Sequence, residues 1–244
     1  QALAGDPGAS AAYLIPNFQN PTGECLGDER RQALAEALQR GHTLLIEDDP
    51  YGALWYDTPP PAPVASRAPE QVVYLGSFSK VLSPGLRVAY MVLPSGHGAS
   101  AVALRSKLLQ AKQACDLHTP GLTQRLIMEL LQSGFDLDEH LRAVRARYRT
   151  QRDVMAHALA TCLPDGCRWR VPPGGMFFWV EALEHVDTVA RLARAVDAGV
   201  AYVPGLPFFS STDTAKTNTL RLSFVTLSPD QIHEAVARLG PCLA

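Results

Sequence analysis

The sequence predicts an α/β protein whose first part is built on a mainly parallel sheet and whose last part is a smaller α+β unit. Between residues 11 and about 95, apolar runs of strand length alternate with a helical pattern. From Ala99 to about Leu163 the pattern is helical, and past Pro172 it changes to shorter elements. Strands that alternate with helices are typical of a parallel sheet covered by helices.

The elements of the first part follow from hydrophobic patterns and turn residues. Strands are expected at residues 12–15, 43–47, 72–76 and 87–93. A helix is expected from Asp28 to Arg40, because Leu34 and Leu38 fall on one face. Gly41 follows as the stop signal, and the proline-rich run Thr58–Pro63 indicates a loop.

The central part is predicted to be helical, with breaks at Thr119–Gly121 and near Ser133–Gly134. One long helix in this stretch is rich in arginine: Arg142, Arg145, Arg147, Arg149 and Arg152. Apolar residues lie between these arginines, among them Leu141, Tyr148 and Met155. We interpret the segment as an amphipathic helix with a solvated basic face, and a nucleic-acid surface is the alternative.

The last part carries shorter elements. A strand is expected around Met176–Val180. A helix is expected to begin near Asp187 and to stop at Gly199, with its apolar face formed by Val189, Leu192 and Val196. Another begins at Ser228–Gln231, which has the spacing of a capping box with proline at the first helical position.

Composition narrows the classes of function. The chain has 244 residues, of which 47% are hydrophobic and 19% charged, so a folded globular protein is expected. A formal net charge of −2 predicts neither a nucleic-acid surface nor a membrane surface. The five cysteines are dispersed without a CxxC pair, which is typical of reduced thiols in the cytoplasm and predicts no zinc site. No apolar run approaches the ~18 residues that a membrane helix needs.

The most informative run is Ser77–Lys80, which follows the apolar run 72–76 and is followed by Arg87. A lysine amine can form an imine with an aldehyde once it has lost its proton. Two hydroxyls and a guanidinium, those of Ser77, Ser79 and Arg87, are groups that bind a phosphate. The alternative is that Lys80 is a solvated loop lysine and Arg87 a surface charge.

Two upstream segments favour the imine interpretation. Asp48 and Tyr51 follow a predicted buried strand, and ligands of open α/β sheets lie beyond the carboxyl ends of the strands. A carboxylate there can keep a pyridinium nitrogen protonated, as pyridoxal phosphate requires. Asn20 precedes Pro21, so its backbone is biased toward extended geometry and its amide can point into a cleft.

Arg221 lies between apolar residues in a strand-like run, where an unpaired guanidinium would be costly. Its planar fork suits a substrate carboxylate, and an internal ion pair is the alternative. The pair Gly174–Gly175 could let backbone approach a substrate, and a plain turn is equally compatible with the sequence.

Four motifs occur in a fixed order along the chain: Asn20–Gly23, then Asp48 with Tyr51, then Ser77–Lys80 with Arg87, and finally Arg221. This ordered set resembles the class I and II aminotransferases of fold type I, and the resemblance covers essentially the whole chain. The amino-acid sequences of the longer segments 13–23 and 111–120 look closest to those of 2-aminoadipate aminotransferases and their broad-specificity relatives. The resemblance implies that residues 1–135 are part of the large cofactor-binding domain with connecting helices, and that 136–244 form the small domain. It also implies an N-terminal portion ahead of this chain, and a homodimer.

The resemblance further implies a role for each matched residue. Lys80 would hold pyridoxal phosphate as an imine and then act as the catalytic base, and Asp48 would pair with the pyridine nitrogen. Asn20 and Tyr51 would bond the ring oxygen. The phosphate would be bound by Ser77, Ser79 and Arg87. The amino acid's carboxylate would be bound by Arg221, with Asn20 beside it.

The expected reaction is transfer of an amino group between an amino acid and a 2-oxo acid. The amino acid would be 2-aminoadipate, glutamate, or a branched or aromatic one. Two alternatives remain open. Another fold type I enzyme, such as a lyase or decarboxylase, would share the cofactor residues. A transcriptional regulator could also carry an aminotransferase-like effector domain behind a DNA-binding head. We expect no metal, no membrane and, from this region, no nucleic acid.

Overall fold

The computed structural model describes residues 9–94, 99–211 and 214–244, and the chain forms two compact units. Unit 1 comprises Gln1–Asn17, Cys25–Ala53 and Pro59–Leu141, and unit 2 comprises Phe18–Glu24, Leu54–Thr58 and Arg142–Ala244. Two short early segments therefore belong to unit 2 although their flanks belong to unit 1. The division of the whole protein into domains at residue 135 stays a prediction.

Unit 1 contains a four-stranded sheet in the order β1-β2-β3-β4. Its strands are β1 (Ala11–Leu14), β2 (Leu44–Asp48), β3 (Val72–Ser77) and β4 (Ala89–Val92). The first three strands are parallel, and β4 is antiparallel to β3. The carboxyl ends of β1, β2 and β3 therefore lie at the same edge, as the sequence predicted. β4 begins later than expected, because Arg87 adopts a left-handed conformation with φ of 52°.

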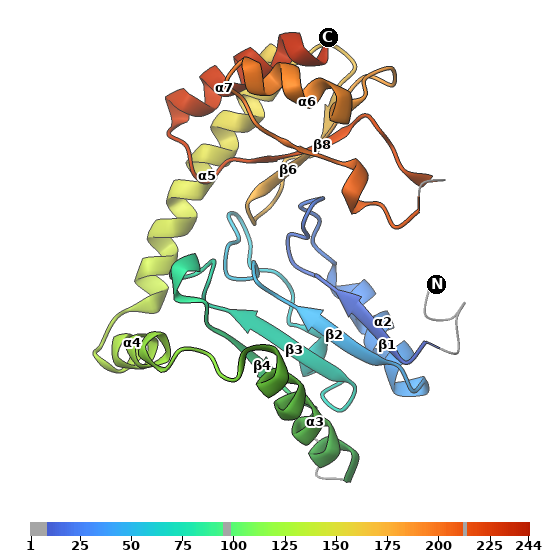
Figure 1. Ribbon diagram of the computed structural model, residues 1–244, viewed down its shortest axis with the longest axis vertical. Helices are drawn as coiled ribbons and strands as arrows, with labels where there is room; N and C mark the ends of the chain where they lie inside the picture. The colour runs from blue at the N-terminus through green and yellow to red at the C-terminus, as the bar shows by residue number, and fades with distance from the viewer. Residues whose placement is uncertain (1–8, 95–98, 212–213) are drawn as a thin grey trace. The chain divides into compact units, whose positions relative to one another are not determined.

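One face of this sheet is covered by α2 (Asp28–Arg40), which has the bounds that the sequence predicted (Figure 1). Ala35 and Leu38 are buried and belong to one apolar cluster with Leu45 and Val72 of the sheet. This burial supplies most of the stability of such a helix, because isolated helices of this length are marginal in water. Gly41 ends the helix, as predicted, with φ of −114°.

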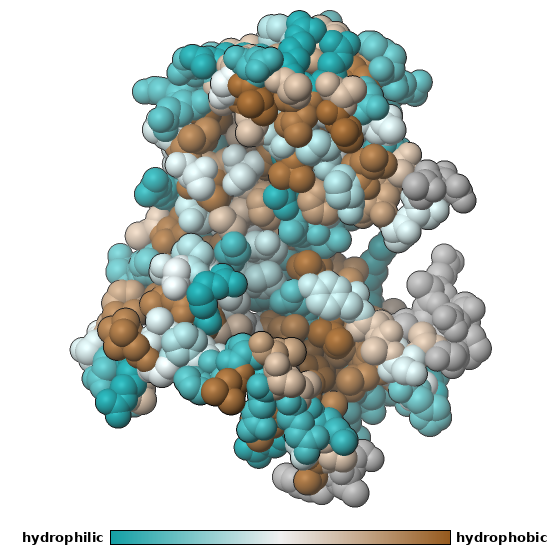
Figure 2. All heavy atoms as spheres, in the orientation of Figure 1, coloured by the Kyte–Doolittle hydropathy of each residue, from teal (hydrophilic) through white to brown (hydrophobic). Residues whose placement is uncertain are grey.

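Three helices follow the sheet: α3 (Ala99–Asp116), α4 (Gly121–Gln132) and α5 (Leu137–Cys162). The breaks between them confirm those predicted from Thr119–Gly121 and Ser133–Gly134. Hydrophobic residues gather over the sheet of unit 1 in the view of Figure 2. Large exposed apolar side chains on β4 are Tyr90, Met91 and Val92. None of the helices in the described part of the chain is long and apolar enough to cross a membrane.

Unit 2 is built on an antiparallel sheet in the order β5-β6-β8-β7. Its strands are β5 (Arg168–Trp169), β6 (Phe177–Glu181), β7 (Val203–Pro204) and β8 (Thr219–Ser223). The helices α6 (Thr188–Asp197) and α7 (Pro229–Leu243) lie side by side and pack with α5 on one apolar core (Figure 1). That core includes Phe178, Val180, Leu220 and Leu222. The other face of the sheet is left to polar and aromatic residues.

The capping box at Ser228 and Gln231 and the end of α6 before Gly199 are confirmed. The predicted apolar face of α6 is wrong in part. Leu192 packs on the core, whereas Val189 and Val196 are 46% and 54% exposed. The buried side of α6 instead includes Thr188, whose hydroxyl oxygen lies 2.9 and 2.8 Å from the carbonyl oxygens of residues 217 and 219 and can donate to one or the other.

The arginine-rich helix α5 is amphipathic, but its basic face is not simply solvated. Arg152 is 6% exposed and donates to Asp57 at 3.0 Å and to the Pro172 carbonyl at 3.3 Å. Arg149 also pairs with Asp57, and Arg145 lies over the Trp55 ring at 4.3 Å. Arg142 and Arg147 are exposed, so the basic face is solvated in part.

Candidate active site

Two adjacent aspartates end the β2 region, and the structure separates their roles. The Asp49 carboxylate accepts bonds from the Gly52 amide at 2.8 Å and the Tyr74 hydroxyl at 2.9 Å. Asp49 therefore stabilises the turn after the strand. Asp48 is the last residue of β2 and is half-buried. Its carboxylate is thus placed at the carboxyl edge of the sheet, and its role toward a cofactor stays a prediction.

Tyr13 is a neighbour of Asp48 that sequence reasoning missed. Tyr13 stands on β1, and its hydroxyl donates to Asp48 Oδ2. Partial desolvation of the hydroxyl, this hydrogen bond and the negative charge of Asp48 raise the pKa of Tyr13 above its usual value. The phenol therefore stays protonated and remains a donor to the carboxylate. Tyr51, the second tyrosine of the region, is only 5% exposed.

A hairpin between β3 and β4 carries Lys80. Ser77 is paired with Ala89, and the next ladder bond runs from the Phe78 amide to the Val88 carbonyl at 3.1 Å. The register of this hairpin therefore brings Ser79 and Arg87 to the same end. The Ser77 hydroxyl accepts from the Ser79 amide at 3.1 Å. Arg87 is exposed, and it donates to the Pro84 carbonyl at 3.4 Å.

The turn around Lys80 is fixed by its neighbours. The Phe78 carbonyl accepts from the amides of Leu82 and Ser83 at 2.9 and 3.2 Å. A ring nitrogen of His140, on α5, lies 2.9 Å from the Val81 carbonyl. The Lys80 side chain is half-buried, and no carboxylate pairs with its amine among residues 9–94, 99–211 and 214–244. A positioned lysine without a counter-ion is suited to covalent chemistry with a carbonyl.

The residues of unit 1 fit a pyridine ring that carries a phosphate. A carboxylate oriented by Tyr13 stands at the end of β2. Two serines and Arg87 stand at the end of the hairpin, where they can donate to an anion. Lys80 lies on the turn between them. These groups are of the types that a ring nitrogen, a phosphate and an aldehyde would need, so the residues present fit the cofactor and their roles stay predictions.

Arg221 and Asn20 form the second group, within unit 2. Arg221 stands on β8, opposite Trp179 of β6, on the face away from the helices. Its Nη1 donates to Asn20 Oδ1 at 2.6 Å. The guanidinium also lies over the rings of Phe177 and Phe208, at 4.2 and 5.3 Å from their centroids. This arrangement holds the fork in place, and the two flanking rings were missed by sequence reasoning.

The segment that carries Asn20 is anchored by close packing. Phe18 is 2% exposed, and the two glycines of the 174–175 turn make room for it. A Cβ on Gly174 would lie 2.5 Å from Phe18 Cζ, and one on Gly175 would lie 2.6 Å from Phe18 Cβ. Gly175 also has φ of +76°, which favours glycine. The glycine pair therefore accommodates a neighbouring side chain.

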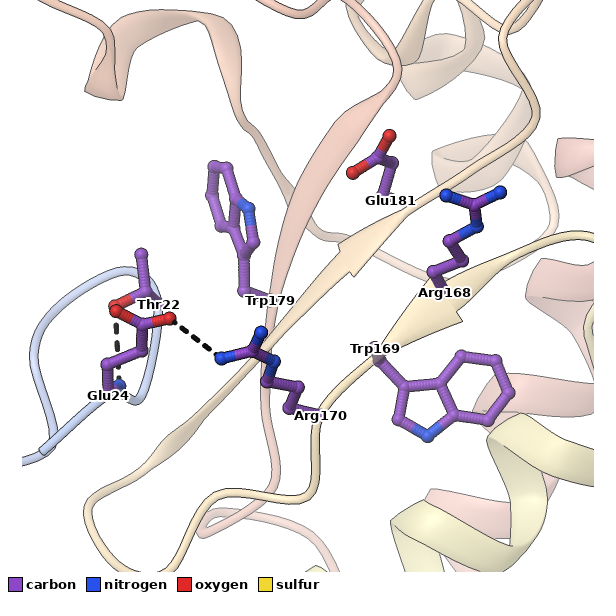
Figure 3. A pocket seen from close by; sticks show the side chains of 7 residues that line it. All are labelled: Thr22, Glu24, Arg168, Trp169, Arg170, Trp179 and Glu181. Carbon is purple, nitrogen blue, oxygen red and sulfur yellow. Dashed lines mark hydrogen bonds and ion pairs between the residues drawn. The ribbon is translucent and has the colours of Figure 1, made fainter.

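A pocket of about 400 Å³ lies on the same face of the unit 2 sheet (Figure 3). It is lined by Thr22, Glu24, Arg168, Trp169, Arg170, Trp179 and Glu181. Arg170 pairs with Glu24 at 3.3 Å, and Glu181 pairs with Lys216 at 2.9 Å. Because its charges are largely matched in pairs and it contains no predicted site residue, we do not assign it to the reaction.

Comparison with known proteins gives a consistent result. The family model of "Aminotransferase class I and II" matches residues 1–239. The chain is 44% identical to the 2-aminoadipate transaminase of Thermus thermophilus, over 95% of this chain and 56% of that protein. It is 39% identical to aromatic-amino-acid aminotransferase 1 of Thermococcus litoralis, over 93% of this chain and 52% of that protein.

Solved structures agree in fold. The alpha-aminoadipate aminotransferase of Thermus thermophilus, complexed with N-(5'-phosphopyridoxyl)-L-leucine, superposes with a TM-score of 0.85. It is 44% identical and is matched over 95% of this chain and 58% of that chain. An uncharacterized HTH-type transcriptional regulator of Bacillus subtilis is 32% identical over 89% of this chain and 43% of that protein.

The chain spans about half the length of the curated relatives it matches. Within that span, the parallel sheet of unit 1 and the small sheet of unit 2 follow the fold type I architecture of these enzymes. The family match extends over nearly all of the sequence. The chain therefore belongs to the class I and II aminotransferases.

Proposed function

We propose that the protein of which this chain is a part is a pyridoxal-phosphate-dependent aminotransferase. The observation that carries the proposal is the combination, in one chain, of Lys80 on a fixed turn and Arg221 held as a fork. The first group suits reaction with a carbonyl, and the second suits a carboxylate. Amino acids and 2-oxo acids are the substrates that need both.

In unit 1, Lys80 would hold the cofactor and then carry the proton that the reaction moves. The cofactor supplies an electron sink for the substrate's α-carbon. Asp48 would hold the proton on the ring nitrogen, and Tyr51 would bond the ring oxygen. The phosphate would be bound by Ser77, Ser79 and Arg87.

In unit 2, Arg221 would bind the substrate's α-carboxylate with both arms of its fork. Asn20 accepts one bond from Arg221, so its oxygen orients the guanidinium. Its amide nitrogen would remain to donate to the cofactor's ring oxygen, which is consistent with the predicted double role. The rings of Phe177 and Phe208 exclude water from the faces of the guanidinium, which strengthens its hydrogen bonds.

The oligomeric state, the cellular location and the range of substrates are also proposals. We propose a homodimer in the cytoplasm that acts on amino acids and 2-oxo acids. The basis for the location is the set of five cysteines without disulfides. Relatives named for 2-aminoadipate and for aromatic amino acids support a broad choice of amino donor.

A regulator with an aminotransferase-like effector domain is the second candidate, because a regulator of this type matches most of the chain. It would bind the same cofactor. The two candidates are distinguished by the full-length gene product: a winged helix-turn-helix ahead of this region, with no turnover of any amino donor, would favour the regulator.

The test of the cofactor assignment is chemical. Full-length protein should show an absorbance band of an imine, and borohydride should then fix the cofactor to a peptide that contains Lys80. Label on Lys107 or Lys112 instead would overturn the assignment. A Lys80→Gln variant serves as the matched control, since it should retain no label.

The test of the substrate assignment is a panel of amino donors with 2-oxoglutarate, compared by kcat/KM. We expect activity with 2-aminoadipate and with at least one apolar or aromatic donor. Activity confined to aspartate would contradict the broad-specificity assignment and leave the aminotransferase proposal standing.

A further inference from the structure

Arg31 is the largest fully buried side chain of the described residues, and it carries a charge. It lies in the first turns of α2 and is 0% exposed. A buried guanidinium is costly unless it makes several hydrogen bonds in good geometry. The partners of its hydrogen bonds therefore indicate which part of the structure the buried guanidinium holds in place.

All acceptors of Arg31 belong to two short stretches of unit 1. Nε donates to the Leu26 carbonyl at 2.8 Å. Nη2 donates to Asn17 Oδ1 at 2.5 Å and to the Pro16 carbonyl at 3.3 Å, and it lies 3.7 Å from the Cys25 sulfur. The backbones of these stretches are joined by a bond from the Leu26 amide to the Pro16 carbonyl at 2.7 Å.

These two stretches flank the segment that carries Asn20. The segment Phe18–Glu24 belongs to unit 2, and the chain leaves unit 1 at Asn17 and returns to it at Cys25. Arg31 therefore binds, within unit 1, the residue where the chain leaves that unit and the residues where it returns. Only a planar fork with donors pointing in different directions can span these acceptors at once.

The segment is closed by backbone bonds of its own, and its first residue, Phe18, packs against the Gly174–Gly175 turn. Inside it, the Gln19 amide donates to the Glu24 carbonyl at 2.8 Å and the Gly23 amide to the Gln19 carbonyl at 2.6 Å. These bonds close a loop whose two ends are adjacent. The base of the loop is held by the bond from the Leu26 amide to the Pro16 carbonyl and by Arg31, which joins Asn17 to the Leu26 carbonyl.

We propose that Arg31 is the positioning residue for the Asn20 turn. By fixing both ends of the segment Phe18–Glu24, its guanidinium restricts the positions that Asn20 can take, and Asn20 in turn orients Arg221. Arg31 touches no reacting atom. The effect on substrate binding rests on the proposed function, whereas the effect on the segment does not.

The test uses full-length protein with three substitutions. Arg31→Met keeps a long side chain and removes every donor. Arg31→Lys keeps the charge but offers a point donor that cannot reach both ends. Leu38→Ala is the matched control, because Leu38 is buried on the same helix in the apolar cluster with Ala35 and Leu45, so its truncation lowers stability through a cavity.

The first readout is hydrogen exchange of peptides that cover residues 18–26. We expect both Arg31 variants to raise exchange of the Gln19 and Gly23 amides by about tenfold or more relative to the rest of unit 1. Leu38→Ala should raise exchange across unit 1 without this local excess. Exchange in the Arg31 variants that matches the Leu38→Ala pattern would overturn the proposal.

The second readout is binding of a non-reacting dicarboxylate, maleate. We expect its dissociation constant to rise by about tenfold in Arg31→Lys and to change less than about twofold in Leu38→Ala. If the unsubstituted protein binds no carboxylate, the proposed function fails and the exchange result still decides the role of Arg31. If Arg31→Met does not fold, Arg31→Lys carries both readouts.

Discussion

The chemical groups of unit 1 and unit 2 are held by different means. In unit 1, Asp48 and Ser77 are the last residues of parallel neighbours, so the backbone alone brings them to one edge. In unit 2, Arg221 stands in the middle of a strand and is oriented by side chains, those of Asn20, Phe177 and Phe208.

This difference has a physical cause. A carboxylate or hydroxyl at a strand end is partly solvated and needs no dedicated partner, whereas a guanidinium in the interior of a sheet needs hydrogen bonds and ring faces to replace water. The groups of unit 1 should therefore tolerate changes in their neighbours, and Arg221 should not. The predictions below test that contrast, from the largest effect to the smallest.

The first prediction separates the two aspartates. Asp48→Asn should lower kcat by about 10²-fold or more, because it removes the charge that the ring nitrogen requires. Asp49→Asn should lower the free energy of unfolding by about 1–3 kcal/mol through its lost bonds to Gly52 or Tyr74, with kcat nearly unchanged. Steady-state kinetics and urea unfolding check both. A larger loss of kcat in Asp49→Asn would show that the register is wrong.

The second prediction concerns Arg221. Arg221→Lys keeps the charge but loses the fork, which is worth about 1.5–3 kcal/mol for a charged hydrogen bond, so KM for the amino donor should rise about 10- to 100-fold. Cofactor absorbance should persist. Arg168→Lys is the control, because Arg168 is an exposed arginine on the same sheet, and it should leave KM unchanged. An unchanged KM in Arg221→Lys would point to a structural role.

The third prediction tests whether side-chain support matters less in unit 1. Tyr13→Phe removes the donor to Asp48, and because Tyr13 is 59% exposed we expect a loss of only about 1 kcal/mol in cofactor affinity. Fluorescence titration of the apoprotein with the cofactor measures this. Tyr74→Phe, which removes the donor to Asp49, should leave cofactor affinity unchanged. Equal effects of both variants would contradict a specific role for Tyr13.

The smallest effects are expected in the pH dependence of stability, and they should have opposite signs in the two units. Burial raises the pKa of Glu47 in unit 1 above its value in the unfolded chain. The contribution of Glu47 to the free energy of unfolding is therefore fully present below the pKa of the unfolded state, and it is lost as pH rises through the pKa of the folded state. Arg152 lowers the pKa of Asp57 in unit 2, so its contribution is present above the unfolded pKa and is lost as pH falls.

Substitution isolates each slope. Glu47→Gln should flatten the loss of stability on raising pH, and Asp57→Asn should flatten the loss on lowering it, by less than about 1 kcal/mol because Asp57 is partly exposed. Urea midpoints of full-length protein measured from about pH 3 to 7 report both slopes. If both substitutions changed the slope of stability against pH in the same direction, the pKa directions would be wrong.

Several features were predictable because their cause is local. The bounds of α2 and the capping box of α7 depend on residues that are neighbours in the chain. The parallel sheet followed from the alternation of elements, and the order of motifs was sufficient to place the chain in its family.

Other features were not predictable, because they depend on contacts between distant residues. The buried side of α6 includes Thr188, which can donate to the carbonyls of residues 217 and 219, and the burial of Arg152 is set by Asp57. Tyr13 was missed since its partner, Asp48, lies on another strand. An alternation of faces along β1 was the one signal that could have indicated which of its side chains reach the sheet edge.

The sequence by itself determined the fold class, the order of the elements and which residue types can carry the chemistry. These features depend on hydrophobic periodicity, helix caps and motifs, which are formed by residues that are close together in the chain. Only the tertiary structure decided which groups meet. Asn20 and Arg221 are separated by 201 positions, and Arg31 joins two stretches of unit 1 that flank the segment Phe18–Glu24. Hydrogen bonds act over about 3 Å in space whatever the separation in sequence, so such pairs become visible only once the chain has folded.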